Sequence, residues 1–335
     1  MFIVNHNLKQ YNTFGFEVTA RYYAEPSSVE EAKEVVAEAH RLKIPVLVLG
    51  GGSNVLFTKD YDGLVIKPAM MGIDVLHQCD QKVSISVGAG VVWDDLVEWC
   101  VARNWGGLEN LSHIPGSVGA APVQNIGAYG AEVKDVVKEV HGFYLETIQS
   151  FSLSVTECVF GYRSSVFKTT LKDKTLITHV VFNLSTTPQP NTRYGQIEQE
   201  LQNYPDRSIQ SVRHAITSIR SQKLPDPQKI GNAGSFFKNP VVAESLALQI
   251  KAAFPQIPLY EAHTGSYKLP AAFLIEKAGW KGVRRGNVGV HGDQPLVLVA
   301  FEGATGAEVV TLSTQIQESV KERFGVWLEP EVNLL

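Results

Sequence analysis

The segment GNAGSFFKNP at residues 231–240 contains a serine whose surroundings suit acid–base chemistry. Ser235 follows small, flexible residues and precedes two phenylalanines, with Lys238 and Asn239 close behind. No G-x-S-x-G elbow surrounds this serine, so a hydrolase nucleophile is disfavoured. A serine held in such a loop could instead donate a proton. A packed structural turn is the alternative interpretation.

Two charged side chains, distant in sequence, could support such chemistry. Arg163 lies in GYRSSVFK, where its guanidinium could hold a carboxylate through two parallel hydrogen bonds. A surface ion pair fits the same residues. Glu331 lies in WLEPEV beside Pro330, which restricts Glu329 and removes a backbone donor, so this terminal strand is expected at a sheet edge. The Glu331 carboxyl group could border a site or remain solvated.

Two glycine-rich segments could hold an elongated, phosphate-containing ligand. GGGSN at 50–54 lets successive backbone N–H groups point at an anion, with Ser53 and Asn54 as side-chain donors. It lacks the third glycine of a G-x-G-x-x-G fingerprint, because Val55 stands there. The second segment, at 114–130, is rich in small residues that leave room for a ligand. Together they favour a bound dinucleotide, with a tight turn and a structural loop as alternatives.

Local signals in the first half of the chain predict alternating helices and strands. Ser28-Val-Glu-Glu31 matches a capping box at the start of a helix. Residues 46–49 form an apolar run typical of a buried strand. Apolar residues at helical spacing over 93–101 predict a second helix that buries Cys100. Segment 106–131 lacks periodicity and is rich in glycine, so we expect it to wrap a ligand.

Similar signals organise the second half. A helix is predicted from residue 209 onward, and KLPDP at 223–227 marks a domain boundary. Thr305-Gly-Ala-Glu308 matches a second capping box, whose helix should end at Gly325. A last strand is predicted over 326–332.

Composition limits the possible classes of protein. A chain of 335 residues exceeds what one hydrophobic core usually supports, so two or three domains are expected. The net charge of -4 argues against a nucleic-acid or membrane surface, and any anionic ligand must be met by a local cluster of Lys and Arg. The three cysteines fit neither a disulfide framework nor a zinc site, and no metal is expected. Without a membrane-length apolar stretch or a signal-peptide layout, the expected location is the cytoplasm.

A series of segments closely resembles the UDP-N-acetylenolpyruvoylglucosamine reductase family of bacterial cell-wall synthesis, also called UDP-N-acetylmuramate dehydrogenase (MurB). They stand in the family's order and cover nearly the whole chain. Tyr194, in its own loop, also resembles the type I branch, which closes a tyrosine over the nucleotide. The matching motifs are NTFG (12–15), LGGGSN (49–54), GLENLSHIPGSVGAAPVQNIGAYG (107–130), FGYRSSVFK (160–168), KLPDP, GNAGSFFKNP and WLEPEV.

The resemblance implies an α+β protein: a two-subdomain FAD-binding fold of the vanillyl-alcohol-oxidase type plus a C-terminal α/β substrate domain. The first FAD-binding subdomain would comprise residues 1–68 with the C-terminal strand 326–335. The second would comprise residues 69–222, and the substrate domain residues 223–325. We expect a monomer.

The same likeness implies the ligand contacts. The UDP-sugar substrate would face Tyr194, Lys223, Asn239 and Gln294. Relatives often carry serines where this chain has Ala120-Ala121, which puts a hydroxyl bond to the flavin diphosphate in question there. Non-covalent FAD would lie on Gly50, Gly51, Gly52, Ser53, Asn54, Ile114, Pro115, Gly116, Gly119, Ala120, Ala121, Ile126 and Gly127.

The chemistry implied by the family is the reduction of an enolpyruvyl ether to a lactyl ether in peptidoglycan synthesis. Hydride would pass from NADPH to FAD and then to the vinyl carbon. Arg163 and Glu331 would stabilise the negative charge that develops toward the substrate carboxylate, and Ser235 would give the proton.

Two other classes remain open on the sequence. An FAD oxidase of the same fold would use O₂, and many such enzymes attach flavin through a histidine near the glycine loop, whereas residues 50–57 contain none. A non-catalytic UDP-sugar or flavin binding protein is hard to reconcile with the joint presence of Arg163, Ser235 and Glu331.

Overall fold

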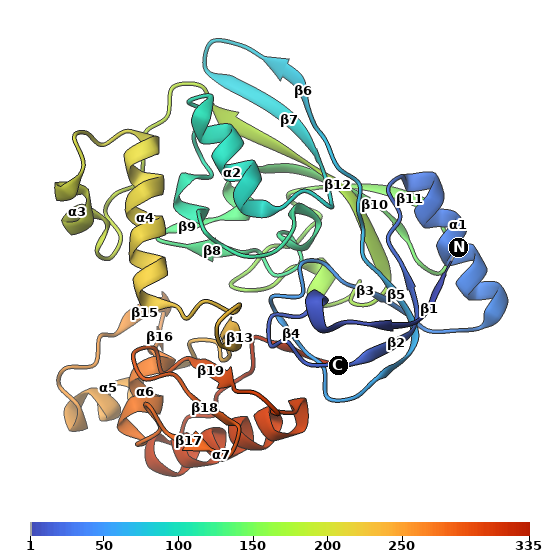
Figure 1. Ribbon diagram of the computed structural model, residues 1–335. Helices are drawn as coiled ribbons and strands as arrows, with labels where there is room; N and C mark the ends of the chain where they lie inside the picture. The colour runs from blue at the N-terminus through green and yellow to red at the C-terminus, as the bar shows by residue number, and fades with distance from the viewer. Residues whose placement is uncertain (1) are drawn as a thin grey trace. The chain divides into compact units, whose positions relative to one another are not determined.

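The computed structural model describes residues 2–335, which divide into two compact units (Figure 1). The first unit comprises residues 2–7, Thr19–Gly52 and Asp60–Gln222. The second comprises Leu8–Val18, Ser53–Lys59 and Lys223–Leu335. Each unit is therefore built from segments that are distant in sequence, and the chain last passes between them at the start of KLPDP.

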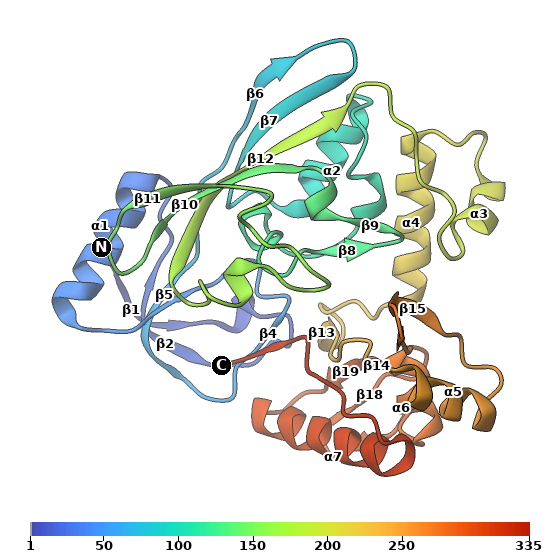
Figure 2. The ribbon, with the colours of Figure 1, turned by 180° about the vertical axis from the view of Figure 1, so that it is seen from behind.

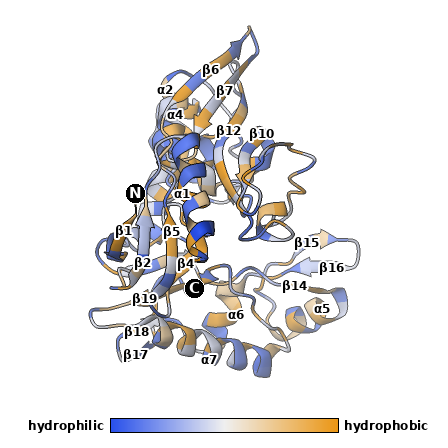
Figure 3. Ribbon diagram, turned by 90° about the vertical axis from the view of Figure 1, so that its right-hand side faces the viewer, coloured by the Kyte–Doolittle hydropathy of each residue, from blue (hydrophilic) through white to orange (hydrophobic). Residues whose placement is uncertain are grey.

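The first unit contains a four-stranded sheet in the order β1-β2-β5-β3. Strand β1 (Ile3–Asn7) runs antiparallel to β2 (Thr19–Ala24), whereas β5 (Tyr61–Ile66) runs parallel to β2 and to β3 (Val46–Val48). Helix α1 (Val29–Leu42) packs its apolar stripe into the core beside this sheet, and its outer face is largely hydrophilic (Figure 3).

The capping box predicted for α1 forms only in part. The Ser28 hydroxyl accepts a hydrogen bond from the Glu31 backbone N–H at 3.1 Å, as predicted. The Glu31 carboxylate, however, accepts its bond from the backbone N–H of Ser27 at 2.7 Å, not from that of Ser28. The Ser27 hydroxyl donates to the same carboxylate oxygen, so a neighbouring residue with two donors outcompetes the cap position.

A five-stranded antiparallel sheet in the order β11-β10-β12-β7-β6 completes the first unit's framework. Helix α2 (Trp93–Ala102) shares its core through Leu96, Val97 and Cys100, which are fully buried. Burial raises the pKa of the Cys100 thiol to about 12, and the predicted core position of this cysteine is confirmed. The strands are β6 (Ile73–Gln78), β7 (Lys82–Gly88), β10 (Val137–Tyr144), β11 (Ser150–Ser154) and β12 (Thr175–Ser185).

Segment 106–131 contains only short elements, as its lack of periodicity predicted. After it, helix α4 (Ile209–Lys223) lies beside α2 in both views (Figures 1 and 2), confirming the predicted helix. The short elements of this unit are η2 (Glu109–Leu111), η3 (Val118–Ala120), β8 (Gly127–Ala128), β9 (Ala131–Glu132), η4 (Val133–Asp135), η5 (Val166–Lys168), α3 (Ile197–Glu200) and η6 (Leu201–Asn203).

The second unit is built around a sheet in the order β13-β19-β18-β17, on which helix α7 (Gly306–Phe324) packs. The capping box at Thr305 and Glu308 is complete, and Gly325 ends α7 with φ +71°, so both predictions are confirmed. The other elements are η1 (Lys9–Tyr11), β4 (Val55–Leu56), β13 (Gly231–Ser235), β14 (Val241–Ala243), α5 (Glu244–Ala253), β15 (Tyr260–His263), β16 (Ser266–Lys268), α6 (Ala271–Lys277), β17 (Arg284–Arg285), β18 (Val288–Val290), β19 (Val297–Ala300) and β20 (Asn333–Leu334).

The strand predicted over 326–332 is wrong, because none of these residues belongs to a regular strand. Regular pairing is confined to β20, which runs parallel to β4, while Pro330 forms only an isolated bridge with Phe237. Pro330 has no backbone N–H, so it cannot continue a ladder. Single backbone bonds on either side of it hold the segment instead, from Lys238 N to Glu329 O at 2.9 Å and from Glu331 N to Phe236 O at 2.8 Å.

Candidate active site

The two glycine-rich segments pack directly against each other in the first unit. A Cβ added at Gly51 would lie 2.7 Å from Gly116 Cα, and one added at Gly50 would lie 2.8 Å from Ala120 Cβ. No side chain fits at either position without a shift of the backbone or of Ala120. The structure thus packs residues separated by more than sixty positions backbone to backbone, with no room for a side chain between them.

The remaining small residues of the second segment have distinct surroundings. Gly119 is as crowded as Gly51, because a Cβ there would lie 2.6 Å from Ala89 Cβ. Ala121 is buried, and its carbonyl accepts a hydrogen bond from Ile126 N at 3.1 Å. Ile114 is half-buried at the start of the segment, whereas Pro115 is exposed.

Asn125, which the sequence analysis did not single out, connects this segment to the loop that carries Arg163. It is fully buried and donates to Gly161 O at 2.9 Å and to the Glu132 carboxylate at 3.0 Å. Its own oxygen accepts from Lys134 N at 3.1 Å. Its position within QNIGAYG and its left-handed φ of +46° make it an anchor of the turn.

Arg163 lies against one of the residues predicted to bind the cofactor. Its Nη2 donates to Gly127 O at 2.6 Å, and a Cβ at Gly127 would lie only 2.9 Å from its Nη1. Arg163 also has a left-handed φ of +51°, a conformation that is costly for a residue with a long side chain. Such strain persists where the surroundings demand it, and it is common at functional sites.

Helix α4 adds two arginines that the sequence analysis missed. Arg213 forms a two-bond ion pair with Asp94 on α2, at 2.7 and 3.1 Å. Arg220 donates from Nε to His113 O at 3.1 Å, immediately before Ile114. The two arginines are seven positions apart, so helical periodicity already places them on one face.

Burial and neighbouring charges shift the pKa values of this cluster. Burial by itself would raise the pKa of the Asp94 carboxyl, but the hydrogen bonds from Arg213 and from the His113 backbone outweigh it, and the pKa lies below its usual value. Burial lowers the pKa of the Arg220 guanidinium, and the charge of Arg163 contributes in the same direction. Arg163, Arg213 and Arg220 therefore lie in one partly buried region, next to the start of the second glycine-rich segment.

In the second unit, the segments of Ser235 and Glu331 are paired through their backbones. Ser235 ends β13 opposite Val297, and the next residue, Phe236, accepts the bond from Glu331 N. Phe236 and Phe237 are almost completely buried, and their packing in the core anchors the loop. Ser235 and Glu331 therefore belong to the same unit, whereas Arg163, the third residue predicted to be catalytic, belongs to the first unit.

Asn54 joins a third segment to the paired segments of Ser235 and Glu331. Its Nδ2 donates to Glu331 O at 3.2 Å, and its carbonyl accepts from Asn333 N at 3.0 Å. The GGGSN loop is thus shared: Gly50, Gly51 and Gly52 lie in the first unit, while Ser53 and Asn54 lie in the second.

The residues expected to face a substrate are spread over both units. Lys223 is the last residue of α4, and Asn239 accepts a hydrogen bond from Ala271 N at 2.9 Å, at the start of α6. Gln294 lies in the turn before β19, where its backbone N–H donates to His291 Nδ1 at 3.2 Å. Tyr194 lies in the first unit, in the loop before α3.

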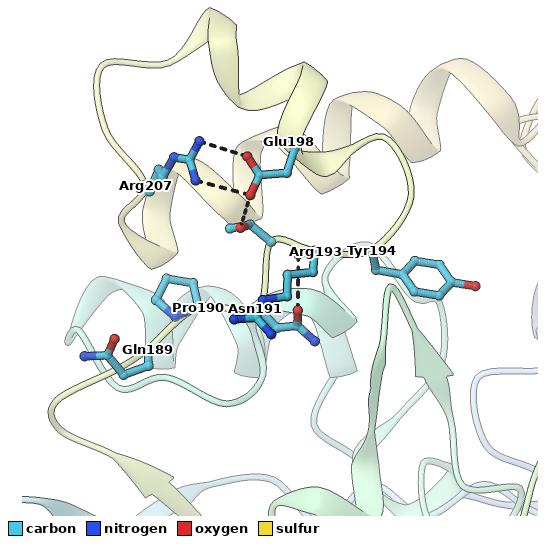
Figure 4. Close-up of a pocket in the computed structure, with 8 residues that line it drawn as sticks. Gln189, Pro190, Asn191, Arg193, Tyr194, Glu198 and Arg207 are labelled. Carbon is cyan, nitrogen blue, oxygen red and sulfur yellow. Dashed lines mark hydrogen bonds and ion pairs between the residues drawn. The ribbon is translucent and has the colours of Figure 1, made fainter.

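The loop of Tyr194 borders an open pocket of about 740 Å³ in the first unit. Figure 4 shows the Tyr194 ring directed away from the ion pair between Glu198 and Arg207, whose nearest atoms are 2.8 Å apart. The ring is 55% exposed and packs edge-on against Tyr129, with 6.3 Å between the centroids. The pocket is lined by Gln189, Pro190, Asn191, Thr192, Arg193, Tyr194, Glu198 and Arg207.

Residues 2–335 contain neither a metal-binding cluster nor a membrane-spanning helix. No group of three or more His, Cys, Asp or Glu side chains in this range is arranged to hold a metal ion. Among the helices of the same range, none is long and apolar enough to cross a membrane.

Comparison with known proteins links this geometry to a family. The model of the UDP-N-acetylenolpyruvoylglucosamine reductase C-terminal domain matches residues 226–335, and an FAD binding domain matches residues 20–143. The UDP-N-acetylenolpyruvoylglucosamine reductase of Bacteroides fragilis is 44% identical over 330 residues, covering 98% of this chain and 99% of the relative. That of Chromobacterium violaceum is 46% identical over 332 residues, covering 98% and 97%.

A solved structure supports the fold. The crystal structure of the same reductase from Thermus caldophilus has a TM-score of 0.68 to this chain at 24% identity, covering 100% of this chain and 99% of that one. The match to the FAD binding domain includes both glycine-rich segments, and the match to the C-terminal domain includes Ser235 and Glu331.

Proposed function

The chain belongs to the UDP-N-acetylenolpyruvoylglucosamine reductase family, and from this premise we propose how its own residues carry out the reaction. The enzyme is an FAD-dependent oxidoreductase that reduces the enolpyruvyl group of UDP-N-acetylglucosamine enolpyruvate in peptidoglycan precursor synthesis. NADPH is the reductant in our proposal, and the enzyme works as a monomer in the cytoplasm.

The glycine segments fit a bound FAD. Side chains are excluded at Gly50 and Gly51 because Gly116 and Ala120 approach so closely, which leaves backbone N–H groups to face a diphosphate. Ala120 offers no hydroxyl, so the backbone would carry that contact alone. Bound there, FAD would supply hydride transfer between NADPH and the substrate.

Arg163 and Glu331 would stabilise the charge that develops on the substrate. Hydride addition to the vinyl carbon leaves negative charge delocalised toward the substrate carboxylate. The guanidinium of Arg163, held in place by Gly127 O at 2.6 Å, is a preorganised donor for such an anion. Glu331 in its protonated form would add a second donor.

Ser235 would then deliver the proton to the neighbouring carbon. A hydroxyl is a weak acid, so it must be held precisely and coupled to a second donor. The observation that carries this assignment is the 2.8 Å backbone hydrogen bond from Glu331 to Phe236, which ties the glutamate segment to the residue after Ser235.

The substrate's nucleotide and sugar would be bound by Tyr194, Lys223, Asn239 and Gln294. Asn239 uses its oxygen to accept from Ala271 N, which leaves its amide N–H groups to donate to phosphate or sugar oxygens. Tyr194, half-exposed beside an open pocket, would cover the nucleotide as in a tyrosine-loop enzyme.

Stopped-flow spectroscopy of Ser235→Ala tests the assignment. We expect NADPH to bleach the flavin absorbance of this variant at the rate of the unmodified enzyme. Its reoxidation by the enolpyruvyl substrate should be slower by about 10²–10⁴-fold, the usual contribution of a positioned acid. Ser152→Ala, at an exposed position on β11, is the matched control and should leave both half-reactions unchanged. Equal losses in the two half-reactions of Ser235→Ala would refute the role of the serine.

A further inference from the structure

Asn110 is a buried asparagine that connects two segments of the first unit. It is 2% exposed, and its Nδ2 donates to Tyr129 O and to Asn191 O, both at 2.8 Å. These two carbonyls fix the orientation of the amide, because a flipped amide would place its oxygen against both of them. Within residues 2–335 the Asn110 Oδ1 atom has no hydrogen-bond partner. The buried amide of Asn110 is therefore stabilised by its two donated hydrogen bonds alone.

Both carbonyls belong to segments that carry a tyrosine. The Tyr129 ring meets the Tyr194 ring at an interplanar angle of 88°, an edge-to-face contact. Between the segments stands Gly130, where a Cβ would lie 3.4 Å from the Tyr194 Cβ and 3.1 Å from the Asn191 Nδ2. Gly130 has a φ of +79°, so both its conformation and its close neighbours favour glycine.

Asn191 adds weaker, outer bonds to the same junction. Its side chain donates to Gly130 O at 3.4 Å and accepts from Arg193 N at 3.2 Å. Asn191 is exposed, whereas Asn110 is buried, so the Asn110 bonds are shielded from water and those of Asn191 are not. The two hydrogen bonds of Asn110 therefore contribute most to holding the two segments together.

From this geometry we infer that Asn110 is a positioning residue for Tyr194 in substrate binding. Tyr194 is itself 55% exposed, so its own burial cannot hold its loop in one conformation. Asn110 holds the backbone of Asn191, three residues before Tyr194, against the turn of Tyr129 that contacts the Tyr194 ring. It thereby reduces the entropy that the loop loses when the sugar nucleotide binds. This inference rests on the substrate-binding role proposed for Tyr194.

A double-mutant cycle with Asn110→Leu and Tyr194→Ala tests the inference. Leucine is close to asparagine in size, removes both donors and eliminates the unpartnered oxygen. In the Tyr194 background we expect Asn110→Leu to raise the KM for UDP-N-acetylglucosamine enolpyruvate about tenfold, with kcat changed less than about twofold. In the Tyr194→Ala background, the same substitution should change KM less than about twofold, because coupled residues are not additive.

The outcomes separate the inference from the proposed function. An equal rise in KM in both backgrounds would overturn the inference, because Asn110 would then act on the site without Tyr194. If the single variant Tyr194→Ala, which retains Asn110, has an unchanged KM, the substrate role proposed for Tyr194 is refuted. Flavin content and thermal unfolding of each variant confirm folding. Should Asn110→Leu not fold, Asn191→Ala removes only the outer bonds, and its smaller rise in KM must also vanish in the Tyr194→Ala background.

Discussion

Replacing Gly51 by alanine should weaken FAD binding through a clash between two backbones. The added Cβ would lie 2.7 Å from Gly116 Cα, whereas ordinary contact begins at 3.4 Å, so the two glycine segments must separate by about 0.7 Å. The neighbouring atom belongs to the backbone and cannot rotate away. Overpacking of this kind typically costs about 1–3 kcal/mol, which corresponds to a loss of affinity of about 5- to 150-fold if the strain falls on the FAD-bound state.

The measurement is a titration of the apoprotein with FAD, followed by quenching of flavin fluorescence. Gly292→Ala is the matched control, because a Cβ at this exposed glycine meets nothing within 4 Å. It should bind FAD like the unmodified protein. Unchanged FAD affinity and unchanged thermal unfolding in Gly51→Ala would show that the segments tolerate the extra atom. The assignment of this contact to the cofactor site would then fail.

Two further predictions follow from the pKa shifts. The folded-state pKa of the Asp94 carboxyl lies below its usual value, so its pairing with Arg213 stabilises the fold above the unfolded pKa and is lost as the pH falls through the folded pKa. The difference in melting temperature between the unmodified protein and Asp94→Asn should therefore shrink between pH 6 and about pH 3; a difference that does not change with pH would contradict it. In the native protein, a thiol reagent should label Cys79 alone, since burial raises the pKa of the Cys100 and Cys158 thiols to about 12. Rapid labelling of more than one thiol before unfolding would refute this reasoning.

Elements determined by neighbouring residues could be predicted from the sequence. The capping box of α7 forms as expected because both partners, Thr305 and Glu308, lie within one turn. The box of α1 forms only in part because Ser27, one position earlier, offers competing donors. The strand predicted over 326–332 does not form, because an apolar pattern indicates burial but does not account for the missing N–H of Pro330.

The sequence indicates candidate site residues but not their contacts. The sequence indicates that Gly51 and Gly116 suit a ligand, yet their mutual approach depends on the packing of a whole unit. The arginines of α4 show the same limit. Their spacing places Arg213 and Arg220 on one helix face, but their partners, Asp94 and His113, lie more than a hundred residues earlier. Only the folded structure reveals that this face holds the start of the glycine segment.

The net charge of the chain bears on how the candidate site could bind an anionic ligand. The chain is acidic overall, with a net charge of -4, so an anionic ligand needs a local excess of cations. The first unit brings Arg163 and Arg220 close to each other. Burial is the main reason that the pKa of Arg220 lies below its usual value, and the charge of Arg163 acts in the same direction. A protein sustains the repulsion between two such charges at a cost in stability, and a bound anion relieves it. FAD and a UDP-sugar are both anionic, so we propose that this region attracts them before any specific hydrogen bond is formed.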